Sequence, residues 1–297
     1  MAGGLFHLPT YGVSVPGLAL PLAMAGLLSA VPILAVRIAG RLPHSLVAVF
    51  AALVLVTVAA SLSAGLAFLT LFGGWALLAG EALSRRRSVI LAGIVGFAIL
   101  SVEAAVASVA GGAAVAEATL DSPQVQKAFD QAAAQASLSP GDAKAAIDDM
   151  RAVIVILHPA LSVISAAVVV AFNVMAIARM AQMTPGSAFP PHELLFLRWP
   201  LSLVVSFVVS GALLLVPALK SVAWNGLVVT LFLFLLQGLS VASFGLARLF
   251  TSELMRALLL AAMLLGPWAI LLSFLGLFDQ WFDFRNRLVA SDGPSAA

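Results

Sequence analysis

Cysteine is absent from this sequence, and charged residues are scarce. None of its 297 residues is Cys, and Asp, Glu, Lys and Arg together make up only 9%. Without cysteine the chain cannot form disulfides, thiolate metal sites, iron–sulfur clusters or a palmitoyl-cysteine anchor. The formal net charge is +2, and the basic residues flank apolar runs. No nucleic-acid partner is therefore predicted.

Recognisable catalytic motifs are absent as well. The sequence contains no GxSxG elbow, no phosphate-binding loop and no paired intramembrane aspartates. Its lysines all lie in connections between apolar runs, which argues against a serine–lysine intramembrane hydrolase. The four histidines share no metal-ligand spacing such as HExxH: His7, His44, His158 and His192. We predict no catalytic residues, no metal site and no cofactor.

Apolar residues dominate what is present. They make up 62% of the chain, and the mean hydropathy is +1.12. A soluble domain of this length would need a more polar exterior, so the outer surface must face lipid. The sequence predicts an all-α fold, a single polytopic transmembrane helical bundle over residues 1–297. Membrane lipids are its expected surroundings.

Eight apolar stretches are long enough to be read as membrane spans. They are residues 17–36, 45–61, 65–80, 88–116, 152–178, 201–218, 222–247 and 257–277. Residues 118–150 form the one long polar connection, and 288–297 a disordered tail. Ser122-Pro123 and Ser139-Pro140 each resemble an N-cap followed by proline at the first helical position. We therefore expect a polar helical loop, whose second helix continues through Arg151 into the fifth span.

The distribution of basic residues predicts the orientation of the chain. Nine Lys or Arg lie in the connections 37–44, 81–87, 179–199 and 248–256, against six on the other side. The positive-inside rule places the side with more Lys and Arg in the cytoplasm. The loop 118–150 and both termini are then expected outside.

Glu103 is a lone carboxylate near the middle of the fourth span. Insertion scales assign a cost of about 2.5–3.5 kcal/mol to such an acid at a helix centre, which makes it a functional-site hypothesis by default. Ser88, Ala92 and Gly96 form a small-residue stripe, and Glu103 follows Gly96 by about two turns on the same face. We expect Glu103 to face the bundle, as a ligand-binding group or as a protonated carboxyl bonded to a neighbouring helix.

Three further polar residues lie at membrane depth: His158, Asn173 and Gln237. His158 precedes a proline at a span end, where its ring can sit in the interface. Asn173 and Gln237 are typical of interhelical hydrogen bonding, worth roughly 0.6 kcal/mol per bond on average. All three are candidate ligand-binding residues, and Gln237 is the expected polar neighbour of Glu103.

The C-terminal stretch Gly276 to Arg285 combines acidic, basic and aromatic residues. Asp279, Trp281, Asp283 and Arg285 are candidates for docking a partner protein or lipid headgroups. The alternative is a helix end held at the headgroups, with Asp283 and Arg287 as an i, i+4 pair and the aromatic side chains as anchors.

Three stretches carry a resemblance to a known family. They are Gln237-Gly238-Leu239-Ser240-Val241, Gly276-Leu277-Phe278-Asp279-Gln280-Trp281-Phe282-Asp283-Phe284-Arg285 and Phe196-Leu197-Arg198-Trp199-Pro200. These resemble the YybS-like family of bacterial polytopic membrane proteins of unknown function, mainly over the last third of the chain. The resemblance implies a bacterial inner membrane location. More distantly, such proteins look like the substrate-binding subunits of energy-coupling-factor vitamin transporters.

Three functions are compatible with these observations. The leading hypothesis is a transport-type protein that binds a small solute or lipid between helices, using Glu103 and Gln237. The alternative is a non-transporting scaffold for envelope or division assembly, which would contact a membrane-protein partner through residues 118–150 and the C-terminal segment. An intramembrane enzyme is the third.

Overall fold

The computed structural model describes residues 30–39, 42–59, 61–84, 89–107, 111–137, 139–182 and 197–291. Within these ranges the secondary structure is helical and no strand occurs, so the all-α prediction is confirmed for this part of the chain. The chain divides into two compact units, Met1–Phe189 and Pro190–Ala297. Each unit is described separately below.

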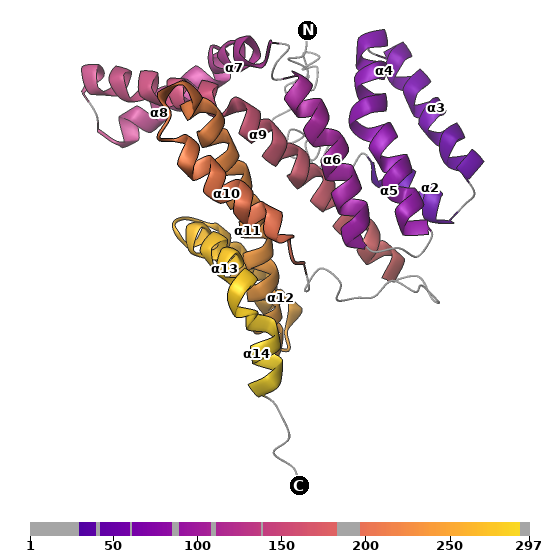
Figure 1. Ribbon diagram of the computed structural model, residues 1–297. Coiled ribbons are helices and arrows are strands. Elements are labelled where there is room, and N and C mark those ends of the chain that lie inside the picture. Colours follow the sequence, from indigo (N-terminus) through magenta and orange to yellow (C-terminus); the bar gives the residue numbers. More distant parts are fainter. Residues whose placement is uncertain are drawn as a thin grey trace. The chain divides into compact units, whose positions relative to one another are not determined.

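The first unit contains helices α2 to α9 (Figure 1) and the π-helical segment η1. Their bounds are α2 Val31–Ala39, α3 Leu42–Ala59, α4 Leu62–Phe68, η1 Leu69–Gly74, α5 Trp75–Ser84, α6 Val89–Ala107, α7 Ala113–Leu120, α8 Pro123–Gln135 and α9 Pro140–Gln182.

Small residues let the helices of the first unit pack closely around Trp75. The Trp75 side chain is fully buried at the start of α5. A Cβ added to Gly96 of α6 would lie 2.8 Å from Cε3 of Trp75 and 3.0 Å from a methyl group of Val170 on α9. Ala92, one turn earlier on α6, is also fully buried. The predicted stripe therefore faces the core at these two positions, whereas Ser88 lies outside the described residues.

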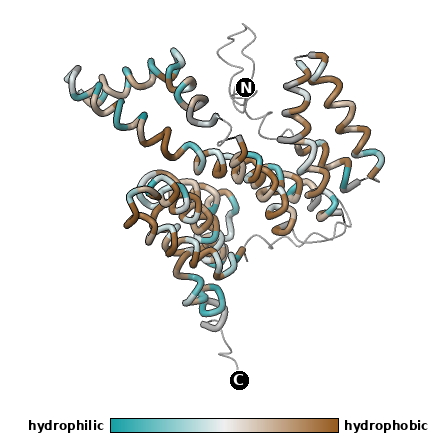
Figure 2. The backbone as a smooth tube through the Cα atoms, turned by 45° about the horizontal axis from the view of Figure 1, so that its top comes forward, coloured by the Kyte–Doolittle hydropathy of each residue, from teal (hydrophilic) through white to brown (hydrophobic). Residues whose placement is uncertain are grey.

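Helix α9 joins the polar connection to an apolar span. It runs without a break from Pro140 to Gln182 and contains Pro159, as the predicted continuation through Arg151 requires. Figure 2 shows hydrophilic residues over α8 and the first turns of α9, and mostly hydrophobic residues over the rest of α9. The preceding α8 has no buried residue, in keeping with a polar helical loop.

The second unit contains helices α10 to α14 and the 3-10 turn η4. Their bounds are α10 Leu201–Leu213, η4 Pro217–Leu219, α11 Lys220–Leu249, α12 Glu253–Leu264, α13 Trp268–Phe282 and α14 Phe284–Ser291. Phe234 of α11 is fully buried and packs with Val204 of α10 and Leu277 of α13. Its ring packs edge to face against the Phe207 ring, with 6.1 Å between the two ring centroids.

Two helices of the described chain are long and apolar enough to cross a membrane. They comprise Gly141–Met180 and Pro217–Leu249. A third crossing results if α12 and α13, which are bent by 102° relative to each other, count as one broken span. The predicted span 257–277 therefore contains the bend between α12 and α13. Gly266 has a φ of +79° and precedes Pro267, and the two residues end one helix and begin the next.

Shorter apolar helices lie at three other predicted spans. They are Leu42–Val58, Ile90–Val106 and Leu201–Leu213. The predicted span 65–80 includes η1, whose π-helical turns contain Gly73 and Gly74. Most of the predicted first span, 17–36, and all but the first residues of the tail 288–297 lie outside the described residues.

Candidate functional site

Glu103 lies half-buried on α6. Leu100 and Ala104, its neighbours on the helix, are buried and continue the face that begins with Ala92 and Gly96. The carboxylate therefore lies at the edge of the packed face. Its proposed pairing with Gln237 would join the two units, and it stays a prediction.

His158 and Asn173 both lie on α9. Asn173 is fully buried, and its Nδ2 donates to the carbonyl oxygen of Val169 at 2.8 Å. His158 is half-buried, and its Nδ1 has no hydrogen-bond partner among the described residues. An unsatisfied buried nitrogen of this kind costs roughly 1–3 kcal/mol.

Two glycines bring α11 and α13 into backbone contact. A Cβ added to Gly238 would lie 1.8 Å from the carbonyl oxygen of Leu272, and one added to Gly276 would lie 2.0 Å from that of Phe234. No other residue fits at either position without separating the helices, because the atoms met belong to the backbone. This crossing places Gln237, next to Gly238, beside the C-terminal end of α13.

Gln237 is fully buried and hydrogen-bonded at both ends of its amide. Its Nε2 donates to Oδ2 of Asp279 at 3.0 Å. Its Oε1 accepts from the Trp199 backbone N–H at 3.1 Å and from Gln280 Nε2 at 3.0 Å. All these partners belong to the second unit. The burial of Gln237 is therefore explained without Glu103.

Asp279 is the centre of the same network. It is 1% exposed, and Arg285, on α14, is 6% exposed. Arg285 donates to Oδ2 of Asp279 at 2.6 Å and to the carbonyl oxygen of Leu197 at 2.8 Å. The other carboxylate oxygen, Oδ1, accepts from the Phe284 backbone N–H at 3.1 Å. Asp279 thus receives three hydrogen bonds, one of them within a buried ion pair.

Trp199 connects this network to the start of α10. Its indole N–H donates to the Leu233 carbonyl oxygen at 2.8 Å, and its own carbonyl oxygen accepts from Gln280 Nε2 at 2.9 Å. We call the set Trp199, Gln237, Asp279, Gln280 and Arg285 the polar cluster. It joins all three stretches that carried the family resemblance.

The polar cluster lies near the middle of α11. Trp199, just before α10, is bonded to Leu233 and Gln237. Further along α10, Ser210 lies against Gly226, where an added Cβ would be 2.3 Å from the serine Oγ. Helix α10 therefore packs along the N-terminal half of α11 only. Its own first turn begins beside Gln237, part-way along a helix that is 30 residues long.

Asp283 and Trp281 have different surroundings from Asp279. Trp281 is 57% exposed. Asp283 ends α13 in the left-handed conformation, with φ 45° and ψ 58°. Its carboxylate lies 3.6 Å from Arg198 and accepts from Asn286 Nδ2 at 2.6 Å. Asp283 and Arg287 keep the i, i+4 spacing of a helix, since the Arg287 N–H donates to the Asp283 carbonyl oxygen at 3.2 Å. The Arg287 guanidinium lies 5.7 Å from the Phe282 ring centroid.

The arrangement pairs one buried cation with one buried anion and surrounds them with amide groups. Such a cluster could exchange its internal partners for a ligand's carboxylate, at Arg285, or a ligand's ammonium, at Asp279. Among the described residues, no group of three or more His, Cys, Asp or Glu side chains could hold a metal ion. Sequence reasoning missed Gln280 and Trp199 as site residues, although both stand in the quoted motifs.

Comparison with known proteins identifies a family for this chain. A family model described as "Predicted membrane protein (DUF2232)" matches residues 11–280. No curated protein and no solved structure matches the chain. The match extends from the N-terminal region to Gln280 and therefore covers most of the polar cluster.

Proposed function

The chain belongs to the DUF2232 family of predicted membrane proteins, and from this premise we propose that it is a transport-type protein that binds a small solute or lipid. In this proposal it crosses the bacterial inner membrane eight times, with the loop 118–150 outside. We also propose the YybS-like relationship and the distant similarity to energy-coupling-factor substrate-binding subunits. The polar cluster is the proposed binding centre.

The observation that carries this proposal is a buried ion pair beside the middle of an apolar helix. The apolar part of α11 lies between Lys220 and Arg248, so a membrane-spanning α11 places Gln237 near mid-depth. Charged side chains at that depth are costly and by default indicate a ligand or ion pathway. An ion pair is also weak as a purely structural device, since apolar residues of similar volume often stabilise a fold equally well.

Helix α10 supports the same interpretation. Because it begins beside Gln237 rather than at the end of α11, its first backbone N–H groups are also near mid-depth in a spanning α11. Helices that begin or end at mid-depth form the substrate sites of many secondary transporters. The polar cluster combines such a helix start with a carboxylate, a guanidinium and two amides.

We further propose that polar groups of the first unit contribute to ligand binding. Glu103 supplies a half-buried carboxylate. His158 supplies a buried ring nitrogen without a hydrogen-bond partner among the described residues. Asn173 is fully buried and uses its Nδ2 within α9. In this proposal Glu103→Gln weakens the binding of a solute by these groups of the first unit.

The test is ligand-dependent thermal unfolding of the full chain in detergent. A panel of amino acids, polyamines, carboxylates and inner-membrane phospholipids is added one at a time. A ligand at about 100 times its Kd should stabilise the folded protein by about 2.7 kcal/mol. The variant Asp279→Asn/Arg285→Gln removes both buried charges together and should lose this stabilisation. Glu253→Gln, on an exposed residue of α12, should retain it.

Two results would overturn the proposal. The first is that no member of the panel stabilises the wild-type chain. The second is that a ligand stabilises the double variant as strongly as the wild type, which would mean that binding does not use the polar cluster.

A second candidate, a non-transporting scaffold, is favoured by exposed surfaces of the described chain. Helix α8 has no buried residue, and Trp281 is 57% exposed at the end of α13. If these surfaces bind a membrane-protein partner, deletion of residues 122–138 should abolish co-purification of that partner while the bundle stays folded. Retained co-purification would argue against a site on α8.

A further inference from the structure

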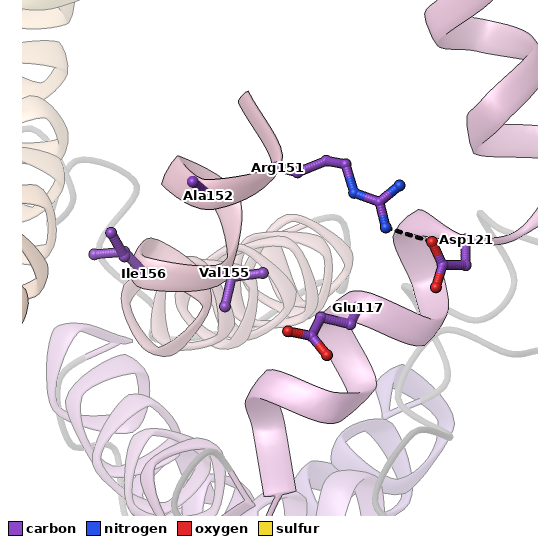
Figure 3. Close-up of a pocket in the computed structure, with 6 residues that line it drawn as sticks. All are labelled: Glu117, Asp121, Arg151, Ala152, Val155 and Ile156. Carbon is purple, nitrogen blue, oxygen red and sulfur yellow. Dashed lines mark hydrogen bonds and ion pairs between the residues drawn. The ribbon is translucent and has the colours of Figure 1, made fainter. Parts of the chain in front are cut away.

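A pocket of about 430 Å3 lies between α7 and α9 in the first unit (Figure 3). Figure 3 shows Arg151 reaching from α9 to Asp121, with the Glu117 carboxylate one turn back on α7 and facing the α9 turn that carries Val155. The pocket is lined by Glu117, Asp121, Arg151, Ala152, Val155 and Ile156.

The lining changes character along α9. Arg151 is the last charged residue of its polar first part, and no Asp, Glu, Lys or Arg occurs from Ala152 to Ala178. That uncharged stretch is longer than the ~30 Å hydrocarbon core requires. In a membrane-spanning α9 the pocket therefore lies where water meets lipid, with its charged wall toward the headgroups and its apolar wall toward the acyl chains.

The charged wall carries one more negative than positive group. Arg151 forms an ion pair with Asp121. Glu117 is exposed and faces the apolar wall. The pocket thus offers an uncompensated carboxylate for an ammonium group. It also offers the remaining guanidinium N–H groups of Arg151 for a phosphate, since that side chain has five donors.

We propose that this pocket binds a phospholipid whose headgroup carries a primary ammonium, of the phosphatidylethanolamine class. The ammonium donates to Glu117, the phosphate accepts from Arg151, and an acyl chain lies along Val155 and Ile156. A quaternary ammonium has no N–H to donate, and a glycerol headgroup has no positive charge. Both should therefore bind less well. This site is in a different unit from the polar cluster, and it does not depend on the proposed transport function.

The experiment is native mass spectrometry of the full chain, titrated with three phospholipids of identical acyl chains. These are phosphatidylethanolamine, phosphatidylcholine and phosphatidylglycerol. The wild-type chain should prefer phosphatidylethanolamine by about tenfold in apparent Kd, the ratio expected of one charge-assisted hydrogen bond. Glu117→Gln should abolish the preference. Asp130→Asn, which removes an exposed acid on α8 outside the pocket, should leave it intact.

Three outcomes would overturn the proposal. Equal affinity for the three lipids would exclude selection of the ammonium. A preference that survives Glu117→Gln would assign it to another site. Glycerophosphoethanolamine, which has the headgroup without acyl chains, serves as a competitor; if it bound as tightly as the lipid, the ligand would be a soluble phosphate ester.

Discussion

Asp279 is the residue on which the other members of the polar cluster depend. It accepts from Gln237, Arg285 and the Phe284 backbone, and it is 1% exposed. Removing its charge leaves the Arg285 guanidinium buried without the Asp279 carboxylate, which is more costly than the absence of both charges. A single substitution therefore measures the cost of burying the guanidinium without this partner. A double substitution measures the net contribution of the pair.

Asp279→Asn should destabilise the protein by about 3–5 kcal/mol. Asp279→Asn/Arg285→Gln should cost clearly less than the single substitution, because no unpaired charge remains. Both are measured by thermal or chemical unfolding in detergent. A double variant less stable than Asp279→Asn alone would contradict this prediction. It would mean that the Arg285 guanidinium does not destabilise the protein when the Asp279 carboxylate is absent.

Substitution of Asp283 measures the effect of backbone conformation on stability rather than the effect of charge. Its φ of 45° lies in the left-handed region, which Gly adopts freely and Asp or Asn tolerate better than most residues. Asp283→Ala should therefore lower stability by about 1–2 kcal/mol, and Asp283→Gly should cost less. Its ion pair with Arg198 is exposed on both sides, so it contributes little. Equal losses for the two variants in thermal unfolding would assign the effect to the side-chain contacts instead.

At the scale of helices, the crossing of α11 and α13 determines the site. The crossing needs a glycine on each helix, because each Cα faces a carbonyl oxygen of the other backbone. Close approach at small residues is the usual way in which helices associate in a membrane. Here it also brings Gln237 within hydrogen-bond distance of Asp279. Packing and polar chemistry thus depend on the same pair of positions.

Gly238→Ala and Gly276→Ala should each destabilise the second unit by about 1–3 kcal/mol or more, because a methyl group would meet backbone atoms. Both should also weaken any ligand binding by the polar cluster. Gly245→Ala is the matched control on α11, since its added Cβ meets no atom within 4 Å. It should be neutral or stabilising by up to about 1 kcal/mol. Equal melting temperatures for the three variants would contradict the described contact.

At the scale of the whole molecule, the number of membrane crossings depends on α12 and α13. Their 102° bend fits either a broken span or a loop that enters and leaves on one side. Eight crossings require α12 and α13 to cross together. The residues on either side of the bent pair then lie on opposite membrane faces.

Because the chain has no native cysteine, single cysteines can report this topology directly. Under the eight-span proposal, Ser295→Cys, in the C-terminal tail, should react with a membrane-impermeant maleimide in intact spheroplasts. Thr251→Cys should react only after permeabilisation. Asp130→Cys, in the polar loop, is the reference for outside labelling. If Thr251→Cys and Ser295→Cys were labelled from the same side, α12 and α13 would form a re-entrant loop and the count of eight would be wrong.

The lipid surroundings, the helical class and the residues of interest follow from the amino-acid sequence alone. Hydropathy is a local property, so a long apolar run predicts a lipid-facing helix without knowledge of its neighbours. Helix capping is also a local property, so Ser139-Pro140 predicts the start of a helix, and α9 begins at Pro140. Gln237, Asp279 and Arg285 were also identifiable from sequence, because polar residues are conspicuous in or beside apolar helices.

The packing of the helices determines which of these residues contact one another. Gln237 is hydrogen-bonded to Asp279 and Gln280, and its burial needs no contact with Glu103. These bonds form because Gly238 and Gly276 let α11 and α13, which are separate in sequence, approach to backbone contact. The bend between α12 and α13 likewise depends on the left-handed backbone conformation of Gly266, which lies within an apolar run. Contacts between helices that are far apart in the chain produce no periodic pattern in the amino-acid sequence. The partners of a buried polar group therefore follow from packing.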